Sequence, residues 1–351
     1  MAGVYLATVV VAIMSTIGAN AVRADEPLTF ETCADLRQYL DHRAPYDEVV
    51  LAQSSYECSE PIHLSVDGLS VDFGGSTLRL ADQALRPVVL LGNLQTPADR
   101  RHKAITASNL VIEGNRANQD YECWGGPCNP QQNDDPLWQQ RVNGITVNGC
   151  DDCAVHNAAI TGARSGGVVV VGSNRLLIDG LVASDSHFDG LAGYWTRDSV
   201  FRNILVHDNA YAGFSFDLNF SDNRIEAFES RDNGDQGLFI RLARGNSFVN
   251  GVFTDNGRNG VYLDRASADL APTCASDTRF EAVTISGSGQ FGAWMDFACE
   301  GNRFVTSQLL DNEDGCLGGR EAALIGLSED SVCSGPETEQ TVEAIADTDQ
   351  S

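Results

Sequence analysis

A glycine followed by apolar residues at alternate positions recurs through the middle of the chain, and this repeat restricts the fold more than any other feature. The repeating glycines are Gly144, Gly167, Gly190, Gly213, Gly237, Gly260 and Gly292. Their spacing is 23 residues, except for one step of 24 and a last step of 32 that contains an insertion around Cys274. A fixed period in this range predicts a solenoid, in which each unit forms one coil and packs on its neighbours.

Each unit has the pattern of β-structure. Short β-branched and aromatic runs alternate with polar turns, which excludes a helical repeat. We expect one turn position to carry the recurring Asp or Asn residues Asp152, Asn174, Asp198, Asn223, Asn246, Asp277 and Asn302. A second turn carries the Asp-Asn pairs 208–209, 232–233, 255–256 and 311–312. Because Asn tolerates left-handed turns and can bond to the next coil, stacked Asn ladders fit this geometry.

The charge of the chain argues against nucleic acid as a partner. There are 49 Asp and Glu residues against 23 Lys and Arg, which gives a formal net charge of −26. Phosphate backbones repel such a chain. Hydrophobic residues make up 42% of the sequence, with 15 Phe, 8 Tyr and 4 Trp, so we expect an ordered core rather than wholesale disorder.

The N-terminus favours export. Residues 4–17 form an apolar run of signal-peptide length, and small residues after it suit cleavage after Ala21 or Ala24. The alternative is an uncleaved anchor, but the run is short for a membrane span, so we expect no span in the mature chain. We therefore expect a secreted protein, or a periplasmic one if the source is a Gram-negative bacterium.

The ten cysteines support the same interpretation. They fall as near neighbours in the sequence: Cys33 and Cys58, Cys123 and Cys128, Cys150 and Cys153, Cys274 and Cys299, Cys316 and Cys333. Sequential pairing into five disulfides is the simplest arrangement, although the sequence leaves the connectivity open. Zinc is the alternative, but the single Cys-x-x-Cys has no second copy and no histidine pair at ligand spacing.

The repeat resembles the right-handed parallel β-helix of the pectin-lyase-like type, which also occurs in exported polysaccharide epimerases and lyases. The Gly-apolar-x-apolar strand, the Asn turn and the closing Asp-Asn turn carry the likeness over residues 105–315. It implies an all-β fold, a single-stranded right-handed parallel β-helix or solenoid. Because one such fold hosts many activities, the likeness implies the fold more strongly than the activity.

We expect three parts in the chain. Residues 1–24 form the signal peptide, residues 25–335 the β-helix domain with clear repeats at 143–314, and residues 336–351 an acidic disordered tail. An amphipathic run at residues 32–40 predicts an N-terminal capping helix over the open end of the coil. We expect the protein to be a monomer.

One face of the repeat has the composition of a sugar-binding groove. Alternate side chains of a strand point to opposite sides, so positions +1 and +3 after each glycine fill the coil and positions +2 and +4 face solvent. The outward residues include Tyr194, Asp217, Phe239, Arg241, Tyr262, Asp264, Trp294 and Asp296. Aromatic rings stack on sugar rings, and charged groups fix hydroxyls and carboxylates.

The spacing of the carboxylates is compatible with glycoside hydrolysis. Neighbouring coils stack about 4.8 Å apart, which places Asp217 and Asp264 roughly 9.6 Å apart and Asp264 and Asp296 about 5 Å apart. Both separations are close to those that glycosidases use.

The other candidate chemistry is proton abstraction beside a uronate carboxylate, which gives elimination or C5 inversion. It needs a base, an acid and a cation that neutralises the carboxylate. Arg241 is the candidate cation, and Tyr194 and His187 are candidate acids or bases. The run 260–265, which ends in Arg265, is similar to runs in mannuronan C5-epimerases. The run 190–195, which ends in Trp195, lacks the Asp-Pro-His-Asp motif of those enzymes.

An insertion at residues 120–142 interrupts the repeat. It contains Cys123, Trp124, Cys128, Asp134, Asp135 and Trp138. We expect an ordered wall beside the groove, with Trp124 and Trp138 as substrate contacts together with Trp195 and Arg265. The paired Asp residues are candidate Ca²⁺ ligands, but the pattern is not specific. No cofactor is certain, Ca²⁺ is the one candidate, and the metal site is unknown.

A polysaccharide lyase or C5-epimerase-like activity is the leading hypothesis, with polysaccharide as the partner. A glycoside hydrolase that uses paired Asp residues is the second. The third is a non-catalytic glycan-binding or surface protein, in which Asp217, Arg241 and Asp264 form a surface ion-pair ladder.

Overall fold

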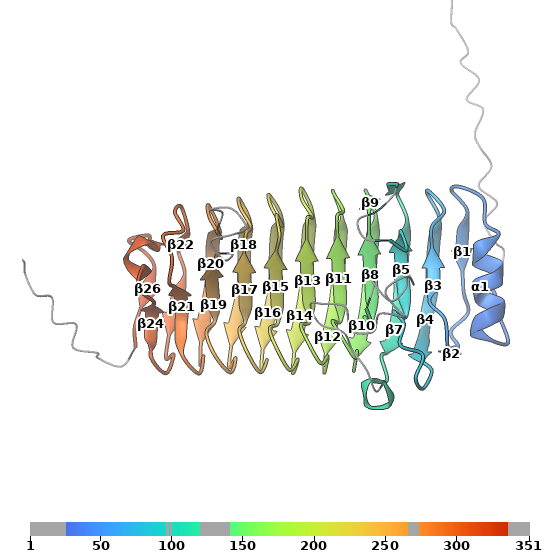
Figure 1. Ribbon diagram of the computed structural model, residues 1–351, viewed down its shortest axis with the longest axis horizontal. Coiled ribbons are helices and arrows are strands. Elements are labelled where there is room, and N and C mark those ends of the chain that lie inside the picture. Colours follow the sequence, from blue (N-terminus) through green and yellow to red (C-terminus); the bar gives the residue numbers. More distant parts are fainter. Residues whose placement is uncertain (1–25, 96–97, 99, 120–140, 266–273, 336–351) are drawn as a thin grey trace, which may run out of the picture.

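The computed structural model describes residues 26–95, 98, 100–119, 141–265 and 274–335. These residues wind into a stack of coils, in which each strand pairs in parallel with its equivalent one repeat along (Figure 1). The predicted parallel β-helix is confirmed. The expected signal peptide and acidic tail lie outside the described residues. No helix in the described ranges has the length and apolarity needed to cross a bilayer.

Two long parallel sheets form the walls of the stack. The larger has fourteen strands: β1 (Glu48–Val50), β2 (Ser55–Cys58), β4 (Ser70–Leu80), β7 (Thr106–Glu113), β10 (Ala154–Thr161), β12 (Leu177–Ser184), β14 (Val200–His207), β16 (Arg224–Arg231), β18 (Ser247–Thr254), β20 (Arg279–Ser286), β22 (Arg303–Val305), β23 (Gln308–Leu310), β25 (Gly326–Leu327) and β26 (Val332–Cys333).

The second sheet has ten strands: β3 (Ile62–Leu64), β5 (Val89–Gly92), β8 (Ile145–Asn148), β11 (Val168–Val171), β13 (Leu191–Tyr194), β15 (Phe214–Asp217), β17 (Leu238–Arg241), β19 (Val261–Asp264), β21 (Phe291–Met295) and β24 (Gly315–Gly318). Strands β6 (His102–Lys103) and β9 (Cys150–Asp151) form a short third sheet. Among the described residues, η1 (Arg116–Asn118) and η3 (Ala322–Leu324) are short 3₁₀ helices.

The core is a column of apolar side chains inside the coils. Positions +1 and +3 after the repeating glycines are fully buried, as predicted, for example Phe214 and Phe216 in β15. Aromatic rings continue the packing from coil to coil, with Phe280 and Phe304 stacked at a centroid distance of 4.5 Å. Because each coil buries its apolar residues against the next, stability comes from contacts between neighbouring repeats.

Asparagine ladders close the turns. At the second turn, the Asp residues are left-handed and the following Asn residues are buried, as expected for stacked coils. Asn233 Nδ2 donates to Asn256 Oδ1 at 2.9 Å, and Asn233 Oδ1 accepts from the backbone N–H of Asn209 at 3.1 Å. Each amide therefore satisfies polar groups of the next coil inside the protein, where water does not reach them.

The prediction of a single Asp/Asn position at the first turn is wrong, because the residues occupy three adjacent positions. Asn174 pairs in register with Asp151, one residue before the left-handed position of Asp152. Asn223 and its equivalents follow that left-handed position and form the buried ladder. Asn suits either a left-handed backbone or a ladder, so the residue type alone does not fix its place.

Replacing Asn233 by Ala is expected to lower the free energy of unfolding by about 3 kcal/mol, because it leaves buried polar groups of neighbouring coils without partners. Urea unfolding followed by circular dichroism measures this. The control is Arg224→Ala, which removes an exposed ion pair with Glu226 and should change stability by less than about 0.5 kcal/mol. Equal effects of the two variants would contradict the role of the ladder.

The predicted capping helix is present as α1 (Cys33–Asp41). Thr32 caps it, since its side chain accepts from the backbone N–H of Asp35, and Leu36 and Leu40 are buried against the first coil. Disulfides join Cys33 to Cys58, Cys150 to Cys153, Cys274 to Cys299 and Cys316 to Cys333, which matches sequential pairing. Cys123 and Cys128 lie outside the described residues.

Candidate functional site

The predicted strip lies on the outer face of the ten-stranded sheet, but it is less exposed than strict alternation predicts. Ser215 and Asp217 are buried, with 9% and 5% of their surface exposed. Phe239, Tyr262 and Trp294 are half-buried. Side chains on stacked coils are about 4.8 Å apart and shield one another, so an outward direction does not guarantee contact with water.

A cavity of about 240 Å³ opens on this face at strands β8, β11 and β13. Its lining combines polar, charged and aromatic side chains, among them Arg141, Asn143, Thr146, Phe188, Asp189, Tyr194 and Trp195. A concave site with a few convergent polar groups is the usual form of a ligand pocket. Of the residues predicted for the site, it contains Tyr194 and Trp195.

Asp189 is the most perturbed acid of this cavity. It precedes Gly190, and its Oδ1 accepts the backbone N–H of Ala212 in the next coil at 3.0 Å. Burial of the carboxyl raises its pKa to about 6, although the hydrogen bonds from Ala212 and Ser215 oppose the shift. Asp189 lines the cavity and is only partly buried as a residue, so a ligand in the cavity would lie beside it.

The ladder position of Asp189 does not require an acid. At the equivalent place in other coils, Asn143 accepts from the N–H of Gly166 at 3.1 Å and Asn259 accepts from the N–H of Phe291 at 3.2 Å. An amide oxygen therefore supplies the structural hydrogen bond. Burying a carboxyl costs free energy, and the structural hydrogen bond of the ladder does not require one. The acid at this one coil therefore indicates a function.

Tyr194 is held in its protonated form. Burial and the neighbouring charges of Asp189 and Asp217 raise the pKa of its phenol to about 12. Ser215 hydrogen-bonds to the side chains of both Tyr194 and Asp189. The cavity therefore contains an acid that titrates near pH 6 and a phenol that stays a proton donor.

Arg141 supplies positive charge to the same cavity. Its charge favours the ionised forms of Asp189 and Tyr194 and so lowers the pKa of both. Its guanidinium also lies 4.8 Å from the centroid of the Phe188 ring. An anionic group bound in the cavity would lie near this guanidinium.

Asp217 and Arg241 form a tight ion pair beside the cavity. Arg241 Nε donates to Asp217 Oδ2 at 3.0 Å and Nη2 to the same atom at 2.5 Å, and this contact raises the pKa of Arg241. Because Asp217 holds both bonds, Arg241 is less available to a substrate than the sequence suggested. The expected three-member ladder is a pair in the described structure, since Asp264 has no ion-pair partner there.

Asp264 and Asp296 lie further along the sheet. Burial raises the pKa of Asp264, and Asp217 and Asp296 add to the shift, while the N–H of Arg265 and the charge of Arg241 oppose it. Asp264 Oδ1 accepts from that N–H at 2.8 Å. The carboxylate of Asp296 accepts from the backbone N–H of Arg320 at 3.2 Å.

The predicted aromatic contacts form small groups along the sheet. Phe239 and Tyr262 stack at a centroid distance of 5.8 Å, and Trp294 packs against Phe291 at 5.0 Å. Trp195 lies at the cavity with 47% of its surface exposed. These rings offer stacking surfaces at several coils.

His187 and Arg265, which were also predicted for the site, lie outside the cavity lining and make contacts with aromatic rings. His187 contacts the rings of Phe188 and Tyr211, and its pKa is lowered by burial and by nearby arginines. Phe188 lines the cavity and His187 does not, so the role of His187 as an acid or base stays a prediction. The guanidinium of Arg265 lies over the ring of Phe297 at 4.1 Å.

The insertion residues Trp124, Trp138, Asp134 and Asp135 lie outside the described residues, so the candidate Ca²⁺ ligands and the expected wall stay predictions. Within the described ranges, no three His, Cys, Asp or Glu side chains come together in a way that could hold a metal ion.

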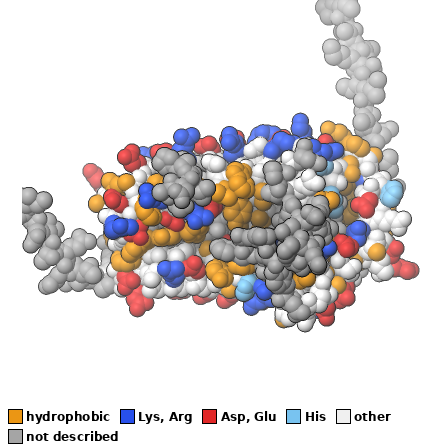
Figure 2. Space-filling model, viewed as in Figure 1, with side chains coloured by type: hydrophobic (Ala, Val, Ile, Leu, Met, Phe, Trp, Pro, Cys, Tyr) orange, Lys and Arg blue, Asp and Glu red, His pale blue; other side chains and the backbone are white. Residues whose placement is uncertain are grey.

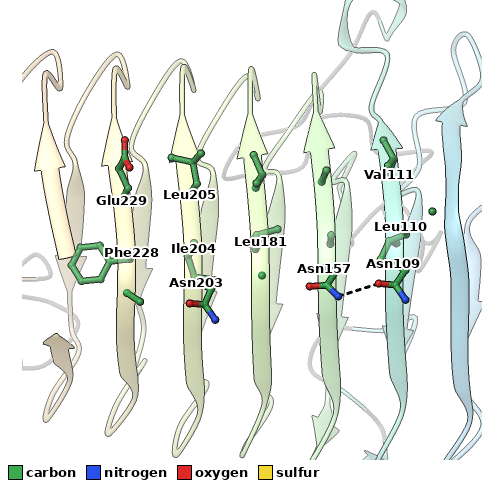
Figure 3. Close-up of a pocket in the computed structure, with 16 residues that line it drawn as sticks. Asn109, Leu110, Val111, Asn157, Leu181, Asn203, Ile204, Leu205, Phe228 and Glu229 are labelled. Atoms are coloured by element: carbon green, nitrogen blue, oxygen red, sulfur yellow. Dashed lines mark hydrogen bonds between the residues drawn. The ribbon is translucent and has the colours of Figure 1, made fainter. Parts of the chain in front are cut away.

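A larger hollow of about 740 Å³ runs across strands β7, β10, β12, β14 and β16 on the other sheet. Figure 3 shows Asn109, Asn157 and Asn203 along it, and Asn157 Nδ2 donates to Asn109 Oδ1 at 3.0 Å. Glu229 is the one acidic or basic side chain in its lining, so this hollow lacks an acid–base pair. The cavity at Asp189 is therefore the better candidate for chemistry.

Sequence reasoning missed Asp189, Ser215 and Arg141. An acid at the position before the repeating glycine, where other coils have Asn143, Gln236 or Asn259, was a readable signal. Arg141 precedes the first clear repeat, and no sequence pattern pointed to it.

The comparisons with known proteins agree with the described coils. Residues 137–274 match a family model described as the right handed beta helix region. No curated protein sequence matches the chain.

Several solved structures share the fold at low sequence identity. The A-module of mannuronan C-5 epimerase AlgE6 from Azotobacter vinelandii is 15% identical, with 85% of this chain and 92% of that chain covered and a TM-score of 0.53. ORF18 of Geobacillus virus E2 is 8% identical, with 81% and 57% covered and a TM-score of 0.64. A family 28 exopolygalacturonase from Yersinia enterocolitica is 10% identical, with 90% and 76% covered and a TM-score of 0.50.

Proposed function

We propose that this chain, which folds into a right-handed parallel β-helix, is an exported, carbohydrate-active protein that removes a proton from a uronate polysaccharide. The polymer lies along the outer face of the ten-stranded sheet. The observation that carries the proposal is the pairing, in one cavity, of an acid with a pKa of about 6 and a phenol with a pKa of about 12.

The proposed reaction begins at the carbon next to the sugar carboxylate. The ionised carboxyl of Asp189 accepts the C5 proton, and Arg141 stabilises the negative charge that develops on the substrate carboxylate. The phenol of Tyr194 then donates a proton. Donation to the leaving glycosidic oxygen, as the C4–O bond breaks, gives an unsaturated sugar, whereas donation to the opposite face of C5 gives the epimer.

An acidic protein that binds an acidic polymer needs positive charge near the binding face. A net charge of −26 repels polyuronates, so local cations must offset it. Lys and Arg side chains gather along one long edge of the molecule in the space-filling view (Figure 2). Arg141 adds positive charge on the face itself. We retain Ca²⁺ as the candidate ion that would assist binding.

The proposal includes export. The four described disulfides are compatible with a secreted or periplasmic protein, because such bonds persist in oxidising compartments. Known structures of similar fold include a mannuronan epimerase module and an exopolygalacturonase, which supports a polysaccharide as the substrate class.

The test is mass spectrometry of a polysaccharide panel incubated with the protein in D₂O, with Ca²⁺ or with chelator. A lyase is expected to give unsaturated ends that absorb ultraviolet light. An epimerase is expected to incorporate one deuterium at C5 without cleavage. Products that gain one water, without unsaturation or C5 deuterium, would contradict proton abstraction. No change on any polymer would contradict a catalytic function.

A glycoside hydrolase is the second candidate, and the raised pKa of Asp264 between Asp217 and Asp296 favours it. Hydrolases use two carboxyl groups in different environments, one of them with a raised pKa. If this candidate is correct, Asp264→Asn should lower hydrolysis at least about 100-fold without unfolding the protein. Sugar release from neutral glycans measures it, and full activity of the variant would rule out the role.

A further inference from the structure

We propose that a second pocket on the same sheet, lined by His63, Arg100 and His102, binds a carboxylate of the polymer several coils from the Asp189 cavity. The inference rests on the proposed function, since it assumes a uronate polymer that follows the axis of the stack. The pocket has a volume of about 300 Å³. It lies outside the residues to which chemistry has been assigned.

The pocket is built from separate segments of the first coils. His63 is in β3, and its Nε2 lies 2.7 Å from the carbonyl oxygen of Gly92. Because a carbonyl only accepts, Nε2 carries the proton and Nδ1 is the nitrogen that can gain one. The carbonyl of Arg100 accepts from Asn93 Nδ2 at 2.6 Å, which fixes the backbone that carries the guanidinium.

The Nδ1 atom of His102 can hydrogen-bond to Arg100 or to Asp67, depending on whether the ring is protonated. Its Nδ1 lies 3.2 Å from Arg100 Nη2 and 3.4 Å from Asp67 Oδ1, and the residue is 5% exposed. A neutral ring accepts from the guanidinium, whereas a protonated ring donates to the carboxylate. Arg100 Nη2 also lies 3.8 Å from Asp67 Oδ1, and the arginine side chain is 60% exposed. A protonated His102 that donates to Asp67 would compete with this ion pair and turn the guanidinium toward a ligand.

Both histidine rings favour the neutral form in this pocket. Burial is the largest cause that lowers the pKa of His63 and of His102. Arg37 opposes protonation of His63, and Arg100 and His63 oppose that of His102, while Asp41 and Asp67 act the other way. A bound carboxylate would add negative charge, raise both pKa values and draw protons into the pocket.

The location suits an extended polymer. Strands β3, β5, β8, β11 and β13 are successive neighbours in the ten-stranded sheet. Four steps of about 4.8 Å place β3 roughly 19 Å from β13, which carries Tyr194. A chain of several sugars that occupies the Asp189 cavity and continues toward α1 reaches the histidines.

The test uses the Asp189→Asn variant, because it leaves the substrate intact and removes the titration of Asp189. Binding of a defined oligouronate is measured by calorimetry at about pH 6 and pH 7.5, in buffers of different ionisation enthalpy. We expect proton uptake on binding and an affinity at least about threefold higher at the lower pH. In NMR titrations, the His63 and His102 resonances should titrate at higher pH in the complex.

Two variants test whether this pocket is the place where the oligouronate carboxylate binds. Arg100→Gln should weaken oligouronate binding about tenfold and leave a neutral oligosaccharide of equal length unaffected. The control Arg224→Gln changes an exposed arginine on the other sheet and should alter neither. Saturable oligouronate binding without proton uptake, without histidine shifts and without an effect of Arg100→Gln would overturn the inference.

The outcomes separate this inference from the proposed function. Turnover by the unmodified protein without histidine shifts in the variant overturns the pocket alone. Binding with the shifts, but without turnover by the unmodified protein, overturns the proposed chemistry and supports the pocket. A complete lack of oligouronate binding overturns the pocket and the proposed substrate together.

Discussion

The variant Asp189→Asn should lose turnover by a factor of about 10²–10⁴ and keep the native fold. The loss follows because an amide cannot accept the C5 proton. The fold persists because an amide oxygen at this position still accepts the N–H of Ala212, as Asn143 and Asn259 accept the equivalent N–H groups in their own coils.

Both the reaction rate and the stability should depend on the ionisation of Asp189. The proposed base acts when ionised, so the rate of the unmodified protein should rise with pH through about 6, the pKa of Asp189. Since the folded pKa lies above the ordinary value, ionisation of this group lowers stability as the pH rises between the two values. The uncharged variant should therefore be at least as stable as its parent at neutral pH.

The measurements are initial rates against pH and thermal unfolding of both proteins. The matched control is Asn259→Asp, which places a carboxyl at the same ladder position three coils along and should keep kcat within about twofold. An Asp189→Asn variant with more than about half of the parent rate would exclude the carboxyl as the base.

The variant Arg241→Leu should lower the free energy of unfolding by about 3 kcal/mol, because it leaves the charge of Asp217 without its partner. Asp217 is 5% exposed and takes both hydrogen bonds from Arg241. The arginine side chain is 38% exposed, which places the expected cost at the lower end for buried pairs.

A double variant distinguishes two contributions to this cost, the loss of the Asp217–Arg241 interaction and the burial of an unpaired Asp217 carboxylate. Adding Asp217→Asn to Arg241→Leu should restore most of the stability, because the amide oxygen can still accept the N–H of Leu218. Urea unfolding of the four proteins gives the coupling energy. A cost of Arg241→Leu below about 0.5 kcal/mol would mean that the pair behaves like an exposed ion pair.

The sequence predicted the coils well because two independent patterns agree. The glycine repeat fixes the length of a coil, and alternation fixes which side chains enter it, so strands such as β15 and β17 follow directly. The kink within the long strands was not predicted. It places residues such as Asn109, Asn203 and Ala227 in the left-handed region, and Ala gives no sequence signal for that conformation.

The candidate site was predicted less completely. Alternation identified Tyr194 and the Asp217–Arg241 pair as members of the outer face, but it carries no information on how neighbouring coils shield one another. Asp189 was not predicted, because the alternation of inward and outward side chains applies to the residues after each glycine and not to the one before it. The contribution of Arg141 depends on where residues preceding the repeat return to the sheet, which local patterns do not encode.

The helix α1 has a consequence for how the molecule exists in solution. A stack of identical parallel coils has no intrinsic length, because each end presents backbone groups that another copy could extend. At the N-terminal end, α1 covers the first coil and Cys33–Cys58 fastens it there. We therefore expect the helix to prevent end-to-end growth, and we expect a variant without it to assemble into filaments.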